Sequence, residues 1–93
     1  MAQLNGQIYV VTGASKGIGR SVSMELAKAG ATVVLLARES EELAQALADV
    51  QQHAGASFAV ACDLGVSTDI EDAASTVLTS CDRLDGLVHN AGD

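Results

Sequence analysis

Apolar runs and amphipathic stretches alternate along the 93 residues of the chain. Mostly apolar runs at residues 8–11, 32–37, 57–62 and 87–89 are typical of parallel strands that are covered on both faces. Between these runs, apolar residues recur every three or four positions, which is typical of helices with one buried face. The pattern therefore predicts four strands alternating with three helices.

Each expected helix has a predicted buried stripe and a predicted end. The stripes are Ile18, Val22 and Leu26 in the first helix, Leu43, Leu47, Val50 and Ala54 in the second, and Ile70, Ala74, Val77 and Cys81 in the third. Gly30 and Gly55 are suited to helix ends. Ser40 can cap the second helix, and Ser67 or Thr68 can cap the third, where Thr68 with Glu71 has the spacing of a capping box.

This alternation predicts an α/β fold. Right-handed crossovers would place the strands in the order 3-2-1-4, which is a three-layer, Rossmann-like half of a doubly wound sheet. We expect one domain over residues 1–93, with its ligand beyond the carboxyl ends of the strands.

A glycine-rich turn, Thr12-Gly-Ala-Ser-Lys-Gly-Ile-Gly19, follows the first strand and opens the first helix. Glycines in such a turn let backbone N–H groups approach an anion, and the helix N-terminus adds partial positive charge. Lys16 and Arg20 are basic, and no carboxylate precedes Glu25. These residues favour an anionic ligand at the turn.

The other strands also end in short polar or small groups: Ala37-Arg38, Asp63-Leu64 and Asn90-Ala91-Gly92. Together with the turn, these groups resemble the motifs of the short-chain dehydrogenase/reductase family, in the same order and spacing. The turn matches TGxxxGxG, Asp63-Leu64 resembles the adenine-contacting pair, and Asn90 to Gly92 resembles NNAG. His89 stands where the family more often has the first Asn. The chain thus resembles the N-terminal, cofactor-binding half of a classical member, a truncated domain.

The resemblance implies a nicotinamide dinucleotide site at these strand ends. Its residues would be Gly13, Ser15, Lys16, Gly17, Ile18, Gly19, Arg38, Asp63, Leu64, Asn90, Ala91 and Gly92. The glycines of the turn would face the pyrophosphate, and Asp63 would accept from the adenine amino group. The alternative for Asp63 is a loop carboxylate that caps the next helix.

The charges near the second strand bear on the choice of cofactor. An NAD site needs a carboxylate for the ribose 2′-OH about 20 residues beyond the turn, and Glu39 has about that separation. Arg38 and Lys16 instead suit a 2′-phosphate, which a carboxylate would repel. We expect Glu39 to point toward the second helix, and we predict NADP(H) over NAD(H).

The family's catalytic residues, a Ser and a Tyr-x-x-x-Lys pair, have no counterpart in this chain. The single tyrosine, Tyr9, lies in the first strand, where we expect it to pack. We assign no catalytic residue, and we expect that this chain by itself does not catalyse carbonyl reduction by the family mechanism. The resemblance implies an oxidoreductase that transfers hydride to or from a carbonyl or alcohol in its complete form. The alternatives are a non-catalytic nucleotide-binding module and a self-assembling module.

Composition restricts the partners. The formal net charge of −7 argues against nucleic acid and anionic membranes. No apolar run is long enough for a transmembrane helix, and the N-terminus does not have the pattern of a secretory signal, so we expect a cytosolic protein. Cys62 and Cys81 have no metal-ligand spacing and are expected as buried thiols, with no metal site. The fourth strand would be an exposed apolar edge, which predicts a homodimer.

Overall fold

The computed structural model describes residues 3–63, 65–81 and 83–89, without the side chains of Ser67 and Ile70. Its elements are β1 (Ile8–Thr12), α1 (Gly17–Lys28), β2 (Thr32–Ala37), α2 (Glu41–Gln51), β3 (Phe58–Ala61), α3 (Ser67–Ser80) and β4 (Gly86–Val88). At each strand end, these bounds differ from the predicted ones by at most one residue. Within the described part of the chain, no helix has the length and apolar character needed to cross a membrane.

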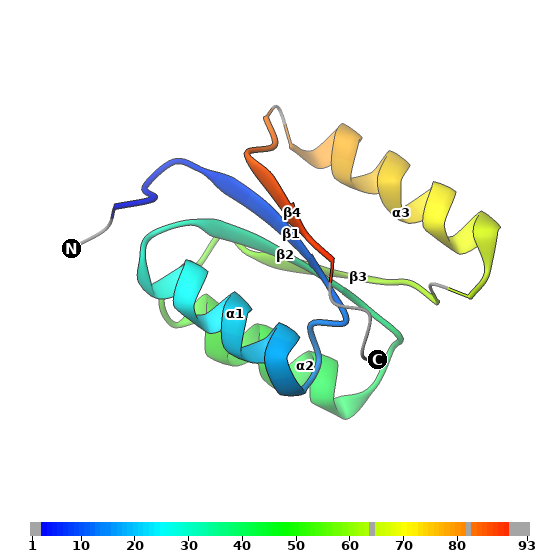
Figure 1. Cartoon of the computed structure of the whole chain (residues 1–93), viewed down its shortest axis with the longest axis horizontal. Coiled ribbons are helices and arrows are strands. Elements are labelled where there is room, and N and C mark those ends of the chain that lie inside the picture. The colour runs from blue at the N-terminus through cyan, green and yellow to red at the C-terminus, as the bar shows by residue number, and fades with distance from the viewer. Residues whose placement is uncertain (1–2, 64, 82, 90–93) are drawn as a thin grey trace.

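The four strands form one parallel sheet in the order β3-β2-β1-β4, as predicted. Helices α1 and α2 cover one face of this sheet, and α3 lies on the opposite face (Figure 1). β1 therefore lies inside the sheet, with β2 on one side and β4 on the other.

Side chains of β1 and β2 alternate between two apolar clusters. Val11, Val33 and Leu35 pack toward α1 and α2. Val34 and Leu36 pack on the other face, in the cluster that also contains residues of α3. This burial on both faces explains why β2 is a continuous apolar run.

The buried stripe of α1 differs from the predicted one by one position. Gly19, Ser23 and Ala27 are buried, whereas Ile18 is 74% exposed. The hydroxyl of Ser23 is satisfied within the helix, because it donates to the carbonyl oxygen of Gly19 at 2.8 Å. Small side chains at the buried positions let α1 pack closely, and the predicted Leu26 lies at the margin of this face, partly buried against the same core cluster.

The other two helices differ less from the sequence prediction. In α2 the buried residues are Leu43, Ala46 and Val50. In α3, Val77 is buried as predicted and Cys81 packs against the same cluster, whereas Ala73 is buried in place of Ala74, which is exposed.

The helix ends test the predicted caps. Ser40 caps α2 as predicted, since its Oγ accepts from the backbone N–H of Leu43 at 3.1 Å. The predicted capping box of α3 is wrong, because Val66 occupies the N-cap position. α2 ends at Gln51, before the expected stop at Gly55.

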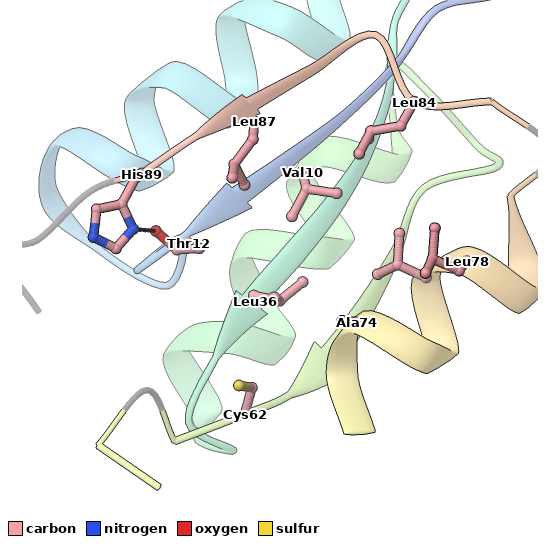
Figure 2. Close-up of a pocket in the computed structure, with 10 residues that line it drawn as sticks. Val10, Thr12, Leu36, Cys62, Ala74, Leu78, Leu84, Leu87 and His89 are labelled. Carbon is pink, nitrogen blue, oxygen red and sulfur yellow. Dashed lines mark hydrogen bonds between the residues drawn. The ribbon is translucent and has the colours of Figure 1, made fainter. Parts of the chain in front are cut away.

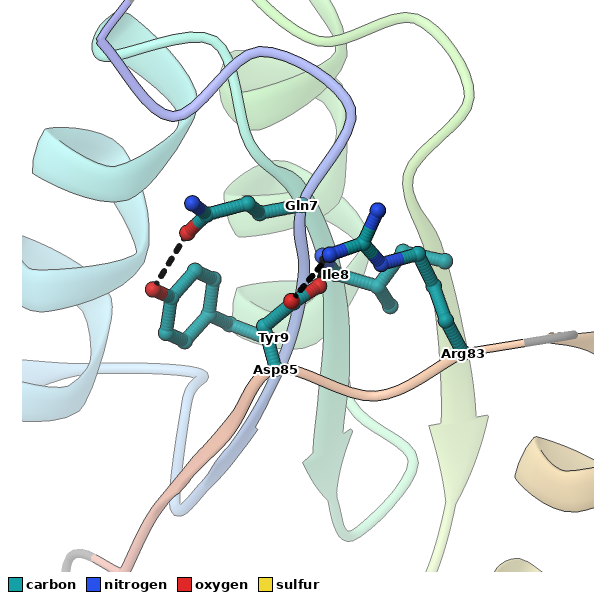
Figure 3. Close-up of polar contacts among 5 residues, drawn as sticks. All are labelled: Gln7, Ile8, Tyr9, Arg83 and Asp85. Atoms are coloured by element: carbon teal, nitrogen blue, oxygen red, sulfur yellow. Dashed lines mark hydrogen bonds and ion pairs between the residues drawn. The ribbon is translucent and has the colours of Figure 1, made fainter.

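Asp85 joins the amino-terminal ends of β4 and β1 (Figure 3). Its carboxylate Oδ2 accepts from the backbone N–H of Ile8 at 2.8 Å, and its own N–H donates to the Ile8 carbonyl at 2.8 Å. The guanidinium of Arg83 pairs with the other carboxylate oxygen. These contacts fix where β4 begins alongside β1.

The next residue, Gly86, gives the Tyr9 ring its space. A Cβ atom at Gly86 would lie 2.6 Å from the ring of Tyr9, closer than van der Waals contact allows. The Tyr9 hydroxyl donates to Oε1 of Gln7 at 2.6 Å. Tyr9 therefore has the packing role expected of it.

The contacts of Asp85 predict a pH-dependent contribution to stability. Hydrogen bonds from Arg83 and then from Ile8 lower the pKa of the Asp85 carboxyl. A lowered folded-state pKa means that the ionised carboxylate stabilises the fold above the unfolded-state value of about 4. This contribution is lost as the pH falls through the folded-state pKa.

We expect Asp85→Asn, which keeps an acceptor but removes the charge, to lower the Tm at neutral pH by roughly a few degrees. The difference from the wild type should shrink at pH values below about 4. Thermal unfolding followed by circular dichroism at a series of pH values measures both effects. Asp72→Asn, at an exposed position of α3, is the control. A constant difference between Asp85→Asn and wild type across this range would contradict the linkage.

Candidate functional site

The glycine turn lies between the end of β1 and the start of α1. Gly13 and Gly17 adopt φ angles of 60° and 61°, a left-handed conformation that residues with a Cβ atom rarely adopt. The backbone N–H of Ala14 donates to the carbonyl oxygen of Leu36 at 3.4 Å and connects the turn to β2. Ser15 is buried at 5% exposure, whereas Lys16 is exposed.

The N-termini of α1 and α2 differ in how they are capped. α2 has the Ser40 cap and two carboxylates, Glu41 and Glu42, in its first turn. α1 has Lys16 at the N-cap position, makes no side-chain capping bond and has no acidic residue in its first turn. Because a helix N-terminus carries unsatisfied N–H groups and partial positive charge, the start of α1 suits an external anion.

A polar cavity of about 280 Å³ lies beside the turn. Its lining residues are Ser15, Lys16, Arg38, Glu39, Ser40 and Glu42. The structure thus brings Lys16 and Arg38 to one cavity, as the cofactor argument requires. Glu39 lines the same cavity, although we expected it to point toward the second helix. The cavity therefore contains carboxylates as well as the two cations.

At the end of β3, Asp63 is partly buried and has a local partner. Its Oδ1 accepts from the N–H of Gly65 at 2.9 Å, and its backbone N–H donates to Oδ2 of Asp69 at 3.1 Å. A carboxylate has about four acceptor positions, so the bond to Gly65 leaves capacity for a ligand. Leu64, Asn90, Ala91 and Gly92, which the sequence also assigns to the site, lie outside the described residues.

Both cysteines are free thiols. Cys62 is buried, and burial, followed by the nearby Asp69 and Asp63, raises the pKa of its thiol. Cys81 is partly buried and ends α3 at the C-cap position, rather than lying within the helix as predicted.

One contact, between the ends of β1 and β4, was not predicted from the sequence. Oγ1 of Thr12 lies 3.2 Å from Nδ1 of His89 and 3.5 Å from the carbonyl oxygen of Val88. The departure of His89 from the family motif was a signal, but its partner could be found only from the strand register.

An apolar groove of about 420 Å³ lies on the face of the sheet that carries α3 (Figure 2). It is lined by Val10, Thr12, Leu36, Cys62, Ala74, Val77, Leu78, Leu84, Leu87 and His89. Three of its leucines are widely exposed, with Leu78 at 73%, Leu84 at 49% and Leu87 at 62%. The groove extends along the outer strand, β4.

Known proteins share this fold. The family model described as short chain dehydrogenase matches residues 7–93. A fatty acyl-CoA reductase from Acinetobacter baylyi is 36% identical over 96% of the chain and 30% of its own length. A short chain dehydrogenase from Escherichia coli, solved as a complex with NADPH, is 40% identical with a TM-score of 0.88 over 99% of the chain and 40% of its own.

L-sorbose reductase from Gluconobacter frateurii, solved with NADPH and L-sorbose, is 33% identical, with a TM-score of 0.88 over 100% of the chain and 36% of its own. The chain belongs to the short-chain dehydrogenase family. It spans 30% of the length of the fatty acyl-CoA reductase and 40% of the length of the Escherichia coli dehydrogenase.

The glycine turn yields a stability prediction. A Cβ atom at Gly17 would meet nothing within 4 Å, so Gly17→Ala adds backbone strain without a steric clash. We expect it to lower the free energy of unfolding by about 1 kcal/mol, the cost of a left-handed alanine. Denaturant titration measures this change.

Gly55→Ala is the matched control, because Gly55 has no positive φ angle and its Cβ would make an ordinary contact 3.9 Å from the Gln51 carbonyl oxygen. It should be neutral or slightly stabilising. Equal stabilities of the two variants would contradict the role of the left-handed turn.

Proposed function

We propose that this chain is the NADP(H)-binding part of a short-chain oxidoreductase. The observation that carries the proposal is the glycine turn at the uncapped start of α1, with Lys16 and Arg38 lining the cavity beside it. The family match and the two relatives solved with NADPH support a nicotinamide dinucleotide as the ligand.

In this proposal the pyrophosphate binds at the start of α1. The left-handed Gly13 and Gly17 bring the backbone close to the phosphates, and Gly19, which is buried, keeps α1 close to the sheet. Ser15 and the exposed Ile18 lie at the same end of the helix, where they would contact phosphate and ribose.

The adenosine half would extend toward β2 and β3. Arg38 follows the carboxyl end of β2, and Asp63 follows β3. In this arrangement Asp63 accepts from the adenine amino group through its remaining acceptor capacity. Leu64, Asn90, Ala91 and Gly92 complete the proposed site from the family motifs.

NADP(H) is preferred in the proposal because two cations line the cavity next to β2. Glu39 and Glu42 line it too and oppose a 2′-phosphate, so the balance depends on how closely Arg38 and Lys16 contact the ligand. A bidentate contact from Arg38 would outweigh a more distant carboxylate.

Catalysis in this proposal belongs to a longer protein. Hydride would pass between the nicotinamide and a carbonyl or alcohol, with the Ser and Tyr-x-x-x-Lys residues supplied outside this chain. Residues 1–93 would form one cofactor-binding domain. A cytosolic location stays a prediction from the sequence.

The cofactor preference is tested by isothermal titration calorimetry with NADP⁺ and NAD⁺. We expect tighter binding of NADP⁺, and a roughly three- to tenfold loss of NADP⁺ affinity in Arg38→Ala, because a charge-assisted contact is removed. NAD⁺ affinity should change by less than about twofold, since NAD⁺ lacks the 2′-phosphate.

Lys28→Ala is the control, since it removes an equal charge from the last turn of α1. Equal affinity for the two cofactors, or equal losses in Arg38→Ala and Lys28→Ala, would overturn the NADP(H) preference. If neither dinucleotide binds, the proposed cofactor-binding function itself fails.

We also propose that the chain forms a homodimer through the outer edge of β4. Leu78, Leu84 and Leu87 are exposed along the apolar groove beside this edge, and exposed apolar surface next to an open strand favours association. A dimer would cover these leucines.

Analytical ultracentrifugation tests this association. We expect a dimer at tens of micromolar, a rough concentration scale for weak interfaces, and a monomer for Leu87→Lys, because a lysine there adds charge to the apolar edge. Gln45→Lys, at an exposed position of α2, should stay dimeric. A monomeric wild type would overturn the dimer proposal.

A further inference from the structure

His89 lies at the point where the direction of the sheet's connections reverses. From β1 the chain leads through α1 to β2 on one side, and α3 leads into β4 on the other side. In parallel sheets of this type, ligands bind in the crevice at the carboxyl ends of the two strands that flank this point. Thr12 ends β1 and His89 follows β4, so the two residues border that crevice.

Thr12 and His89 contact each other across this crevice (Figure 2). The 3.2 Å contact joins Oγ1 of Thr12 and Nδ1 of His89. Thr12 is 5% exposed and is the first residue of the glycine turn, whereas His89 is exposed. His89 therefore touches the residue from which the glycine turn begins, and it is accessible from solvent.

The contact is compatible with both charge states of the imidazole. If the Thr12 hydroxyl donates to the Val88 carbonyl oxygen, at 3.5 Å, its oxygen can accept from Nδ1–H of His89. If Nδ1 carries no proton, the hydroxyl can donate to it instead. Protonation thus changes the charge beside the crevice without breaking the contact with Thr12.

None of the described side chains that line the apolar groove together with His89 is a carboxylate. The other side chains of the apolar groove are uncharged at neutral pH, including Cys62, whose thiol pKa is raised by burial. Asp63 follows β3 and Asp69 lies in the first turn of α3, and β3 is separated from β4 by β2 and β1. Asp85, at the opposite end of β4, pairs with Arg83.

We propose that His89 is a positioning residue that couples dinucleotide affinity to proton binding. It holds Thr12 at the start of the glycine turn, and in its imidazolium form it adds positive charge where the anionic dinucleotide binds. This inference rests on the proposed cofactor-binding function. Histidine is the side chain whose charge ordinarily changes between about pH 5 and 8, which an asparagine at this position could not do.

The sign of the coupling follows from linkage. A ligand that binds the protonated form more tightly is bound with proton uptake, so affinity rises as the pH falls. A single charge near the solvent-exposed edge of the site gives a modest effect, which we expect to be roughly threefold between about pH 8 and pH 5.5.

The test is the dissociation constant of NADP⁺ as a function of pH for the full chain and its variants. The variants are His89→Asn, His89→Ala and His53→Asn. His89→Asn keeps a donor and an acceptor for Thr12 but carries no charge. His53→Asn removes the other histidine of the chain, which is exposed just beyond α2.

We expect His89→Asn to match the wild type at pH 8 within about twofold and to bind roughly threefold more weakly at pH 5.5. His89→Ala should bind more weakly at both pH values, because the contact between His89 and Thr12 is removed. His53→Asn should follow the wild type. Titration of the 2′-phosphate of NADP⁺ is common to all variants and cancels in the ratio of their affinities.

Three outcomes would overturn the inference. An affinity ratio of wild type to His89→Asn that is constant with pH excludes the charge effect, and equal affinities of His89→Ala and wild type at pH 8 exclude the positioning role. If His53→Asn and His89→Asn change the pH dependence of NADP⁺ affinity equally, the effect comes from the overall charge of the protein and not from the position of His89. In each case NADP⁺ still binds and the proposed function stands, whereas absence of binding in every variant overturns the proposed function. Circular dichroism identifies a variant that fails to fold, and His89→Asn then carries the test.

Discussion

The pairing of β1 with a neighbour on each side determines where the other parts of the molecule lie. Because β2 and β4 flank β1, the chain must cross one face of the sheet with α1 and the other with α3. The glycine turn therefore emerges at the boundary between the two layers of helices. The uncapped start of α1, the polar cavity and the Thr12–His89 contact all lie at that carboxyl edge.

Two kinds of sequence signal predicted the fold and the glycine turn. The continuous apolar run of β2 gave its bounds, because a strand buried on both faces contains little else. The order of the strands followed from the handedness of the crossovers. Ser40 was predictable as a cap because its hydroxyl serves a backbone N–H only three residues away. These features depend on local residues or on general rules of chain topology.

Features that depend on tertiary packing were not predicted. The buried face of α1 consists of glycine, serine and alanine, so close packing decided it and hydrophobicity did not. Glu39 lines the polar cavity because of how the segment between β2 and α2 runs, which residue spacing does not specify. The Thr12–His89 contact needs the register of β1 and β4, which lie 77 positions apart in the chain.

That register is fixed at the opposite end of the sheet from the site. The carboxylate of Asp85 accepts from the Ile8 N–H, and the Asp85 N–H donates to the Ile8 carbonyl oxygen. Gly86 pairs with Tyr9, so the pairs that follow are Val10 with Leu87 and Val11 with Val88. One residue beyond the last of these pairs, Oγ1 of Thr12 lies 3.2 Å from Nδ1 of His89. A slip of one residue at Asp85 would move His89 by about 3.3 Å and turn Leu87 to the other face of the sheet. Because β4 is only three residues long, a substitution at Asp85 or Gly86 would change the distance between Thr12 and His89 at the opposite end of the strand.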